Sequence, residues 1–558
     1  MSEKYEVDVL IVGGSMAGSC LARHLRLRHP DLNITVVEKK SVFDHGIGES
    51  MLEIFWDYAC KDLGLSKYLE SNYFYKHGLR FFFEQEGRDC SLPNMSEMGR
   101  TWYHAIPAHQ INRKKFDNDL IELNRNLGIR VDMGVSITDV ERLENGKHKA
   151  TASDGTSYLC RWLVDASGFS SVLGRKRKDV KRIDSHPVSS AWMRVKNIND
   201  IDNLGDLKWR ERVNYANRSL STNHFMYRGY WIWMIPIDEI TYSLGVVWHH
   251  DKTDVNIRGE RELEAFLLSH KWVRELFGDS YEIADFSAMK NMTRVAETFF
   301  SPERWFRTGM AAGFIDPLFS SGSAFLTDIN RMIVDIIESD MRGESTAVMT
   351  KCGAYDIYAH WWLDNFLYHI VGNYHGNYEL HKLLFKSLLM DYFGIIFPAS
   401  TAELWRQFGE LDEASLASLK GHLYHLGTRD GEGGSAFAHK VKDELAMFLE
   451  ETGDPLKNNK GMFHDVEIAP TYMANSLMRG RALTEDAIVR MRSAIEIEAL
   501  NDAVEIVADH LGISLTEDDK RRIREAFETG DAKSLKDGVE LLKAQTKFDH
   551  QTAESFGK

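Results

Sequence analysis

The first forty residues carry the pattern that most restricts how this chain folds. A β-branched run, Val7–Val12, is followed by a small-residue turn at 13–18 (Gly-Gly-Ser-Met-Ala-Gly) and then by a helical pattern. A second apolar run, Ile34–Val37, ends at Glu38, 20 residues after the turn. Strand, tight turn, helix, strand and acid in this order predict the βαβ unit of a doubly wound, Rossmann-like α/β domain.

The residues of this unit have distinct predicted tasks at a dinucleotide. Gly13 permits the turn, and Gly18 lets helix and strand approach, so that helix N-terminal amides face a pyrophosphate. Ser15 stands where the usual pattern has its second glycine, and its hydroxyl can add a hydrogen bond. Glu38 is expected to bind a ribose hydroxyl, which favours FAD or NAD over NADP. The remaining contacts predicted for this unit are Gly14, Ala17 and Lys39.

The composition excludes several classes of protein. The chain has 558 residues, 43% of them hydrophobic and 27% charged, which predicts two or three globular domains with room for a buried cofactor. A net charge of −15 argues against nucleic-acid binding, because the one dense basic run, 175–182, is short. The N-terminus has no apolar signal region, and no uncharged apolar stretch reaches about 18 residues. We therefore expect a cytoplasmic protein with no membrane span.

The cysteines give no sign of a metal centre or a disulfide framework. The five are widely spaced, with no Cys-x-x-Cys pair and no histidine nearby at metal-ligand spacing. We expect reduced thiols and no metal.

Three later segments are typical of a domain that closes over a flavin. A meander over 135–140 and 149–158 leads into an apolar strand that ends at Asp165. Arg113 precedes a helix expected over 118–126. Residues 309–317 (Gly-Met-Ala-Ala-Gly-Phe-Ile-Asp-Pro) lead into a turn of small residues. Together these segments resemble the FAD-dependent aromatic hydroxylase superfamily, which implies an FAD-binding domain of that type.

One position departs from the superfamily pattern. The last segment normally reads Gly-Asp-Ala, with the Asp on the ribityl chain, and here Met310 takes the place of that Asp. The resemblance therefore implies that Arg113, Glu49 and the main chain of 313–322 hold more of the cofactor. The other contacts that it implies are Ser50, Asp165, Gly168, Gly313 and Asp316.

A further run narrows the resemblance. Residues 229–236 read Gly-Tyr-Trp-Ile-Trp-Met-Ile-Pro, which is typical of a half-buried strand with both tryptophans on one face. The run matches the Trp-x-Trp-x-Ile-Pro signature of flavin-dependent halogenases, and 314–322 resembles their second signature near the isoalloxazine. The chain thus resembles the tryptophan halogenase-like branch, whose bulky rings are thought to prevent ordinary monooxygenation. The implied site walls are Trp231, Trp233, Ile235, Pro236, Pro317 and Phe319.

The resemblance also implies a catalytic lysine away from the flavin, five residues before a phenylalanine on a strand. Lys76 has this spacing to Phe81. An amine can hold an electrophilic halogen by a hydrogen bond or as a haloamine. Ser321 and Gly322 are the implied contacts for chloride or bromide. Relatives that act on free tryptophan carry a glutamate where this chain has Phe319, which favours phenolic, pyrrolic or carrier-bound rings.

The predicted function is a two-component halogenase. FAD would act as FADH2, delivered by a separate flavin reductase, with oxygen and a halide as co-substrates and an aromatic small molecule or carrier-protein-bound ring as the acceptor. Met310 and Phe319 keep an FAD-dependent monooxygenase or oxidase open as an alternative. A catalytically silent flavin-binding or partner-binding protein is the third possibility.

The resemblance covers about residues 5–345. We expect a module over 1–345 and a helical C-terminal domain over 346–558. The expected nucleotide-binding parts are about 5–60, 105–185 and 295–345, and the mixed substrate-side β-sheet comprises about 70–105 and 186–295. In the C-terminal part we expect helices over 355–371, 378–393 and 485–511, and a capping box at 516–519. Its aromatic residues, such as Trp361 and Trp362, are interpreted as core rather than as a lid or metal site.

Overall fold

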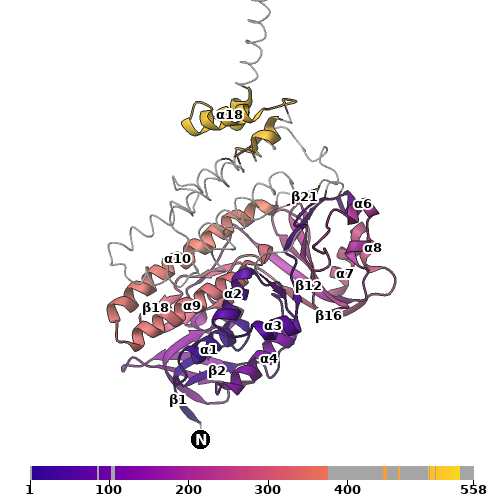
Figure 1. The fold of residues 1–558 in the computed structure, drawn as a ribbon. Helices are drawn as coiled ribbons and strands as arrows, with labels where there is room; N and C mark the ends of the chain where they lie inside the picture. The colour runs from indigo at the N-terminus through magenta and orange to yellow at the C-terminus, as the bar shows by residue number, and fades with distance from the viewer. Residues whose placement is uncertain are drawn as a thin grey trace, which may run out of the picture.

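The computed structural model describes residues 3–374, apart from 45, 85–86 and 102–106, and shorter stretches further along the chain (Figure 1). Those stretches are 463–465, 511–540 and short helical pieces within 441–448 and 500–508.

The nucleotide-binding half is built on an eight-stranded sheet with strand order β18–β19–β10–β1–β2–β7. β1 is parallel to both of its neighbours, β10 and β2, and its apolar residues are buried on both faces, as the β-branched run predicts. The antiparallel hairpin β8–β9 attaches to β10. The strands are β1 Lys4–Val12, β2 Ile34–Glu38, β7 Arg130–Met133, β8 Ile137–Arg142, β9 His148–Ala152, β10 Ser157–Asp165, β18 Phe300–Ser301 and β19 Trp305–Arg307.

Two helices pack beside this sheet, and two more pack against those helices. α1 (Met16–Arg28) joins β1 to β2 and packs against α4 (Arg113–Asn126), while α2 (Glu53–Lys61) leads into the short α3 (Ser66–Asn72). α4 begins five residues before the expected start at 118, because the Asn112 side chain accepts a hydrogen bond from the Lys115 amide and caps the helix there.

The meander also differs in one detail from the sequence prediction. The segment 149–158 was expected as one strand, and it contains the end of β9 and the start of β10, joined by a turn at 153–156. Asp154 makes this turn, because its carboxylate accepts a hydrogen bond from the Thr156 amide at 2.9 Å.

The substrate-side half is a second eight-stranded sheet, with strand order β16–β12–β15–β14–β13–β4–β5–β21. Most of its strands are buried on both faces. One face packs toward the nucleotide-binding half, and the other is covered by α7 (Glu260–Leu268) and α8 (Lys271–Phe277), where Phe225 stacks on Trp272 at 3.6 Å between ring centroids. The strands are β4 Leu79–Phe83, β5 Ser96–Gly99, β12 Val188–Lys196, β13 Thr222–Tyr227, β14 Tyr230–Pro236, β15 Thr241–His249, β16 Glu282–Met289 and β21 Phe463–Asp465.

Short elements complete the frame between the sheets. β3 pairs with β6, and β11, β17 and β20 form a three-stranded sheet. Their bounds, with those of the two remaining short helices, are β3 Phe74–Tyr75, β6 His109–Gln110, β11 Val180–Arg182, β17 Arg294–Ala296, β20 Gly313–Phe314, α5 Val172–Arg177 and α6 Leu207–Arg210.

Two long helices, α9 (Ser321–Met341) and α10 (Ser345–Val371), lie side by side against the module (Figure 1). The α10 side chains Trp361, Trp362 and Phe366 are buried in the same core as the nucleotide-binding sheet, and Trp362 lies 5.0 Å from Phe325 of α9. The core interpretation of these aromatic residues is confirmed. α10 thus shares the core of residues that precede 346.

Further along, α18 (Glu517–Thr529) begins with the expected capping box, in which Thr516 and Asp519 exchange hydrogen bonds. The expected helix over 378–393 and most of the one over 485–511 lie outside the described residues.

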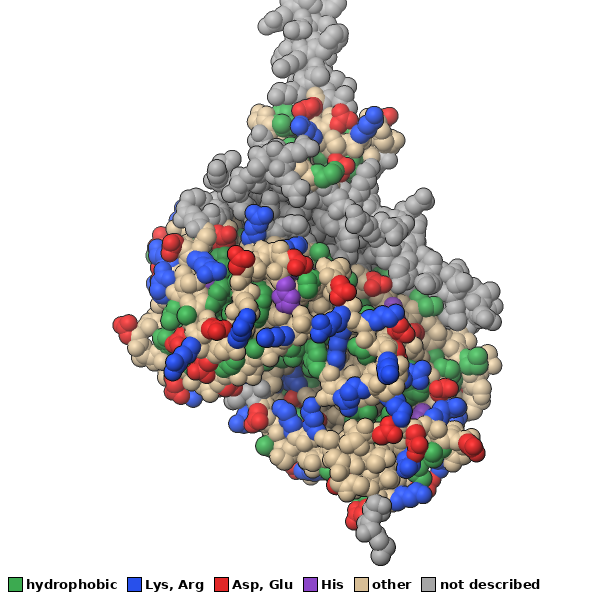
Figure 2. Space-filling model, turned by 180° about the vertical axis from the view of Figure 1, so that it is seen from behind, with side chains coloured by type: hydrophobic (Ala, Val, Ile, Leu, Met, Phe, Trp, Pro, Cys, Tyr) green, Lys and Arg blue, Asp and Glu red, His purple; other side chains and the backbone are tan. Residues whose placement is uncertain are grey.

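Two structural features are absent from the described ranges. No helix in them is long and apolar enough to cross a membrane. In the same residues, no group of three or more His, Cys, Asp or Glu side chains is placed to hold a metal ion. On the face seen in Figure 2, Lys and Arg side chains are mixed with Asp and Glu. Such mixing gives that face no field of a single sign.

Candidate functional site

A cavity of about 710 Å³ is lined by the loops at the carboxyl ends of β1, β2 and β10 and by one face of the substrate-side sheet. Ligands bind at this edge of open α/β sheets, and the volume is within the range of cofactor pockets. The residues predicted for the site that line this cavity are Gly13, Ser15, Ala17, Glu38, Lys39, Glu49, Ser50, Arg113, Gly168, Trp231, Trp233, Ile235, Gly313, Pro317 and Gly322.

The turn after β1 leaves no space for side chains at its first and last glycines. Gly13 has a φ of +110°, and a Cβ there would lie 2.3 Å from the Ala166 carbonyl oxygen. A Cβ at Gly18 would lie 2.0 Å from the Gly13 carbonyl oxygen. The turn therefore brings the N-terminus of α1 to the cavity, where backbone amides can receive a pyrophosphate. Gly14 and Gly18 shape the turn from outside the lining.

Glu38 is held rigidly at the end of β2. Its carboxylate accepts hydrogen bonds from the Gly14 amide at 2.8 Å and the Lys40 amide at 2.9 Å, and the side chain lines the cavity. Beside it, Lys39 Nζ donates to Ser170 Oγ at 2.8 Å. This geometry suits the ribose of an adenosine, because a fixed carboxylate accepts hydrogen bonds from hydroxyl groups.

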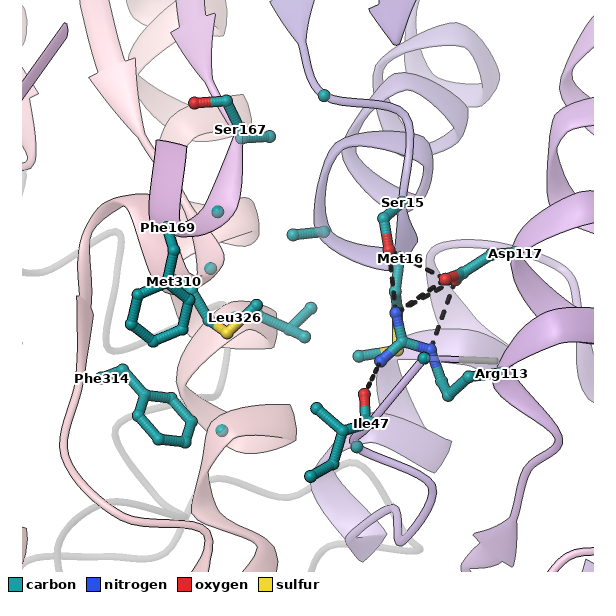
Figure 3. Close-up of a pocket in the computed structure, with 18 of the residues that line it drawn as sticks. Ser15, Met16, Ile47, Arg113, Asp117, Ser167, Phe169, Met310, Phe314 and Leu326 are labelled. Atoms are coloured by element: carbon teal, nitrogen blue, oxygen red, sulfur yellow. Dashed lines mark hydrogen bonds and ion pairs between the residues drawn. The ribbon is translucent and has the colours of Figure 1, made fainter. Parts of the chain in front are cut away.

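Arg113 is a charged group of the cavity lining that lies next to Ser15 of the α1 turn (Figure 3). It pairs with Asp117 at 2.8 Å, donates to Ser15 Oγ at 2.9 Å and donates to the Ile47 carbonyl oxygen at 2.6 Å. Ser15 Oγ in turn donates to Asp117 at 2.9 Å. Asp117 was missed by the sequence prediction, although its position four residues after Arg113 on one helix was a usable sign.

The facing wall is apolar (Figure 3). Phe169 and Phe314 meet at 6.0 Å between ring centroids, and Met310 lies beside them on the cavity lining. Arg294 fixes this wall, since it donates to the carbonyl oxygens of Gly168, Phe169 and Met310 at 2.8 to 3.0 Å. The position where an Asp would contact the ribityl chain thus holds a thioether, and main-chain groups are tied down around it.

Three predicted cofactor contacts bind the protein itself. Glu49 lines the cavity, but its carboxylate pairs with the buried Arg194 of β12 at 3.0 Å. The Asp165 carboxylate accepts from the Ser167 amide at 3.0 Å and lies off the lining. Burial raises the pKa of Asp165.

Asp316 also lies off the lining, in a buried hydrogen-bond network. Its carboxylate contacts His186 Nε2 at 2.8 Å and accepts from the Leu318 amide at 2.9 Å and the Tyr374 hydroxyl at 2.6 Å. The hydroxyl of Tyr374 accepts from Trp231 Nε1 at 3.0 Å. Asp316 therefore connects the loop before α9 to the tryptophan strand β14.

The tryptophan strand lies as the period-two pattern predicts. Trp231 and Trp233 of β14 both line the cavity, with ring centroids 5.8 Å apart, and Trp233 Nε1 donates to Ser243 Oγ at 3.1 Å. Ile235 lies on the same face, whereas Pro236 is off the lining. The three side chains form an apolar wall above the turn at 317–322.

That turn is strained. Phe319 and Ser320 have φ of +68° and +59°, and α9 begins at the next residue, Ser321. Phe319 and Ser321 are buried off the lining, whereas Gly322 lines the cavity. A Cβ at Gly322 would meet no atom within 4 Å. The N-terminus of a 21-residue helix therefore opens onto the cavity at a residue without a side chain, which is a suitable place for a small anion.

Lys76 lies behind this cavity, between β3 and β4. It is buried, and its Nζ donates to the carbonyl oxygen of Met51, a lining residue, at 2.9 Å. Burial lowers the pKa of Lys76 from 10.5 to about 8, partly offset by the charge of Glu53. Lys76 is itself off the lining.

A chain of hydroxyl groups connects the turn with the strands beside Lys76. Ser320 Oγ donates to Ser50 Oγ at 2.9 Å, and Ser50 Oγ lies 2.7 Å from Thr222 Oγ1. Gln110 of β6 donates to the same Thr222 oxygen at 2.8 Å. Ser320, Ser50 and Thr222 all line the cavity. Thr222 and Gln110 were missed by the sequence prediction, because neither belongs to a motif.

The chain is similar to known flavin-dependent halogenases in sequence and in fold. The tryptophan halogenase family profile matches residues 8–93. A flavin-dependent halogenase, chlA, of Dictyostelium discoideum is 28% identical over 432 residues, which cover 70% of each chain. A 1H-pyrrole-2-carbonyl peptidyl-carrier protein chlorinase of Pseudomonas fluorescens is 25% identical over 358 residues, 60% of this chain and 76% of that one.

Solved structures show the same fold. The halogenase PltM in complex with phloroglucinol and FAD superposes with a TM-score of 0.56 at 16% identity, over 91% of this chain and 96% of that one. The flavin-dependent brominase Bmp2 superposes with a TM-score of 0.54 at 21% identity, over 79% of this chain and all of that one.

Fold and site together define an FAD-dependent oxidoreductase with a Rossmann-like nucleotide domain and a second sheet over the cavity. Within that class, the chain is similar in sequence to flavin-dependent halogenases.

Proposed function

We propose that this protein halogenates an electron-rich aromatic ring, using reduced FAD, oxygen and a halide, and that Lys76 delivers the halogen. The observation that carries the proposal is the position of Lys76. Lys76 is a buried amine that is bonded to the backbone of a lining residue. A chain of hydroxyl groups connects the flavin-side turn with the strands beside Lys76. A reagent formed at the turn would be captured there.

The residues present fit FAD. The Gly13 and Gly18 positions exclude any side chain from the pyrophosphate turn, Glu38 is fixed for a ribose, and Arg113 faces the cavity. When bound in its reduced form, FAD supplies the activation of oxygen from which a halide yields hypohalous acid. The α9 N-terminus at Gly322 would bind the halide, and Trp231 and Trp233 would exclude water from that volume.

Lys76 would then act on hypohalous acid. As the ammonium form it donates a hydrogen bond to the oxygen and so makes the halogen more electrophilic. The ring carbon forms a bond to the halogen while the halogen–oxygen bond breaks, and the oxygen takes a proton from Lys76 and leaves as water. The ring proton passes to the resulting neutral amine, so that ArH and HOX give ArX and H2O with Lys76 restored.

Substitution of Lys76 tests the proposal. With bromide, chemically reduced FAD and phloroglucinol, Lys76→Ala should lose brominated product by at least about a hundredfold. FAD affinity should stay the same, because Lys76 lies off the cavity lining. Lys76→Arg should also fail, since a guanidinium has a different shape and cannot release its proton to the leaving oxygen.

The measured quantity is brominated product per oxygen consumed in wild type and both variants. Equal yield in Lys76→Ala would remove Lys76 from the mechanism. Hydroxylated product in all three proteins, with or without bromide, would establish the monooxygenase alternative.

We also propose that a separate flavin reductase delivers the reduced FAD. The sequence has one glycine-rich βαβ unit, at residues 7–38, and the cavity beside it is of a size for one dinucleotide. NADH added to the FAD-loaded protein should therefore leave the flavin absorbance unchanged over the turnover time. Rapid bleaching by NADH alone would contradict a two-component system.

The substrate class is proposed from the turn that precedes α9. Phe319 is a buried apolar side chain where a carboxylate would favour free tryptophan, which leaves a phenolic or pyrrolic ring, free or bound to a carrier protein. A panel of free phenols and carrier-bound pyrroles, compared by kcat/KM, separates these substrates. Free tryptophan as the best substrate would contradict the assignment.

A further inference from the structure

Resting on the proposed halogenation, we infer that His224 is a second catalytic residue, which accepts a hydrogen bond from the O–H of hypohalous acid while Lys76 donates one to its oxygen. His224 would take the role of the carboxylate that this chain lacks at Phe319.

His224 lies in the right part of the fold. It shares one face of β13 with Thr222, the last hydroxyl of the chain that starts at Ser320, and both residues line the cavity. Its imidazole stacks on Phe81 at 4.5 Å between ring centroids, and Phe81 lies 5.6 Å from Phe319. His224 is therefore the next polar side chain along the wall that leads from the halide turn.

The hydrogen bonds of the ring determine which nitrogen is available. Nδ1 lies 3.1 Å from the carbonyl oxygen of Arg80, which can only accept, so Nδ1 carries the proton. In a neutral imidazole, Nε2 is then an acceptor. His224 lines the cavity, and we infer that Nε2 faces it.

The environment keeps the imidazole neutral. Burial lowers the pKa of His224 to about 3, and the charge of Lys76 adds to this effect. The side chain is therefore an acceptor at every pH at which the enzyme would work. The strand pairing brings the two groups to the same part of the sheet, because β13 is parallel to β4, with Thr222 opposite Leu79 and Lys76 three residues before Leu79.

This pair matches the chemistry of hypohalous acid, whose oxygen accepts and whose proton donates. Held by Lys76 Nζ and His224 Nε2, the molecule has its O–H directed at the histidine and its halogen free for the ring carbon. His224 gains no proton in the reaction, because Lys76 supplies the proton for the leaving water and recovers one from the ring. Its task is to keep the oxidant from diffusing away before the ring attacks.

The test separates capture from formation of the oxidant. Wild type, His224→Phe and His224→Gln are given bromide, chemically reduced FAD and phloroglucinol. Monochlorodimedone in the surrounding solution traps any hypobromous acid that leaves the protein. Phenylalanine preserves the stacking but removes the acceptor, and glutamine retains an acceptor near Nε2. His270→Phe is the control, since His270 is buried under the other face of the same sheet, bonded to the Tyr230 hydroxyl at 2.9 Å.

His224→Phe should lower brominated phloroglucinol about tenfold, the effect of one lost hydrogen bond at the reacting group, and raise trapped bromine correspondingly. The sum of brominated phloroglucinol and trapped product should stay constant, and so should the FAD affinity. His224→Gln should restore part of the yield of brominated phloroglucinol, and His270→Phe should change neither product. Should the phenylalanine variant not bind FAD, the smaller His224→Leu replaces it.

Two results would overturn the role of His224. One is an unchanged split between ring product and trap, and the other is an equal fall in both, which would place His224 in oxidant formation. Absence of bromination in wild type would instead refute the proposed function itself.

Discussion

At the scale of single residues, Lys76 combines a cost to the stability of the fold with a proposed role in the reaction. Its pKa of about 8 means that both protonation states exist near neutral pH. If the ammonium form holds the oxidant, activity is present below pH 8 and falls as the pH rises through 8. The haloamine route requires the neutral amine and gives the opposite slope.

We expect activity to fall as the pH rises through 8. His224 accepts a hydrogen bond from hypohalous acid, so the oxygen of that acid still needs a donor, which the ammonium form of Lys76 supplies. The measurement is the pH profile of single-turnover halogenation with chloride and with bromide. An inflection that moves with the halide belongs to hypohalous acid, and one that stays near pH 8 belongs to Lys76. A rate that rises through pH 8 with both halides would favour the haloamine.

The burial of Lys76 also predicts an effect on stability. Its folded pKa lies below the unfolded value of 10.5, so the ammonium penalises the folded state below about pH 8, and the penalty disappears as the pH approaches 10.5. Lys76→Met should therefore stabilise the protein by on the order of 2 kcal/mol at pH 7 while abolishing halogenation. The melting temperatures of the two proteins should converge at high pH. A Lys76→Met variant less stable than wild type at pH 7 would show that Nζ is well solvated or fully paired.

Residue by residue, the sequence was informative wherever a function imposes a fixed spacing. Gly13 of the turn lines the cavity, as do Trp231 and Trp233, and Lys76 lies before its strand. Arg194 and His224 were not found, since each is an isolated side chain on a strand. Their partners, Glu49 and Arg80, lie more than a hundred residues away in sequence.

At the scale of elements, the N-terminus of α9 is where the halide would bind. Gly322→Ala should leave the melting temperature unchanged or slightly higher, because its Cβ meets no atom within 4 Å and alanine favours a helix. The same methyl group would project into the cavity and should lower halogenated product at least about tenfold.

Gly18→Ala is the matched control for that prediction. Its Cβ would lie 2.0 Å from the Gly13 carbonyl oxygen, so α1 must move, and both FAD affinity and melting temperature should fall. Calorimetric melting, FAD titration and the bromide dependence of product formation distinguish the two variants. Full activity in Gly322→Ala would move the halide away from α9.

Element boundaries were predictable only where local chemistry decides them. The capping box before α18 was visible in sequence because both of its partners, Thr516 and Asp519, are local. The early start of α4 depends on a single cap at Asn112, and the turn at 153–156 depends on Asp154. Asparagine and aspartate are common in turns as well as at caps, so neither residue alone fixes the boundary.

At the scale of the whole molecule, the segment after residue 345 supports the site from outside the cavity lining. α10 packs its tryptophans into the core of the module, and Tyr374, just beyond it, donates to Asp316 and accepts from Trp231. No local pattern connects Tyr374 with the tryptophan strand, because the contact spans 143 residues. Such a connection arises only once both sheets and both long helices are assembled.

Tyr374→Phe should therefore affect the reaction from a distance. It leaves the Trp231 N–H without its partner and removes one hydrogen bond from Asp316, each in a buried place, at a cost of about 1–3 kcal/mol. With its anchor weakened, the loop from Asp316 to the strained Ser320 should hold the halide less well, raising the KM for bromide more than it lowers kcat. Tyr355→Phe is the control, because the Tyr355 hydroxyl donates to Asp335 across the same two helices, away from the loop. Both variants should melt at a lower temperature than wild type, and only Tyr374→Phe should change the KM for bromide. An equal KM in the two variants would mean that the network only supports the fold.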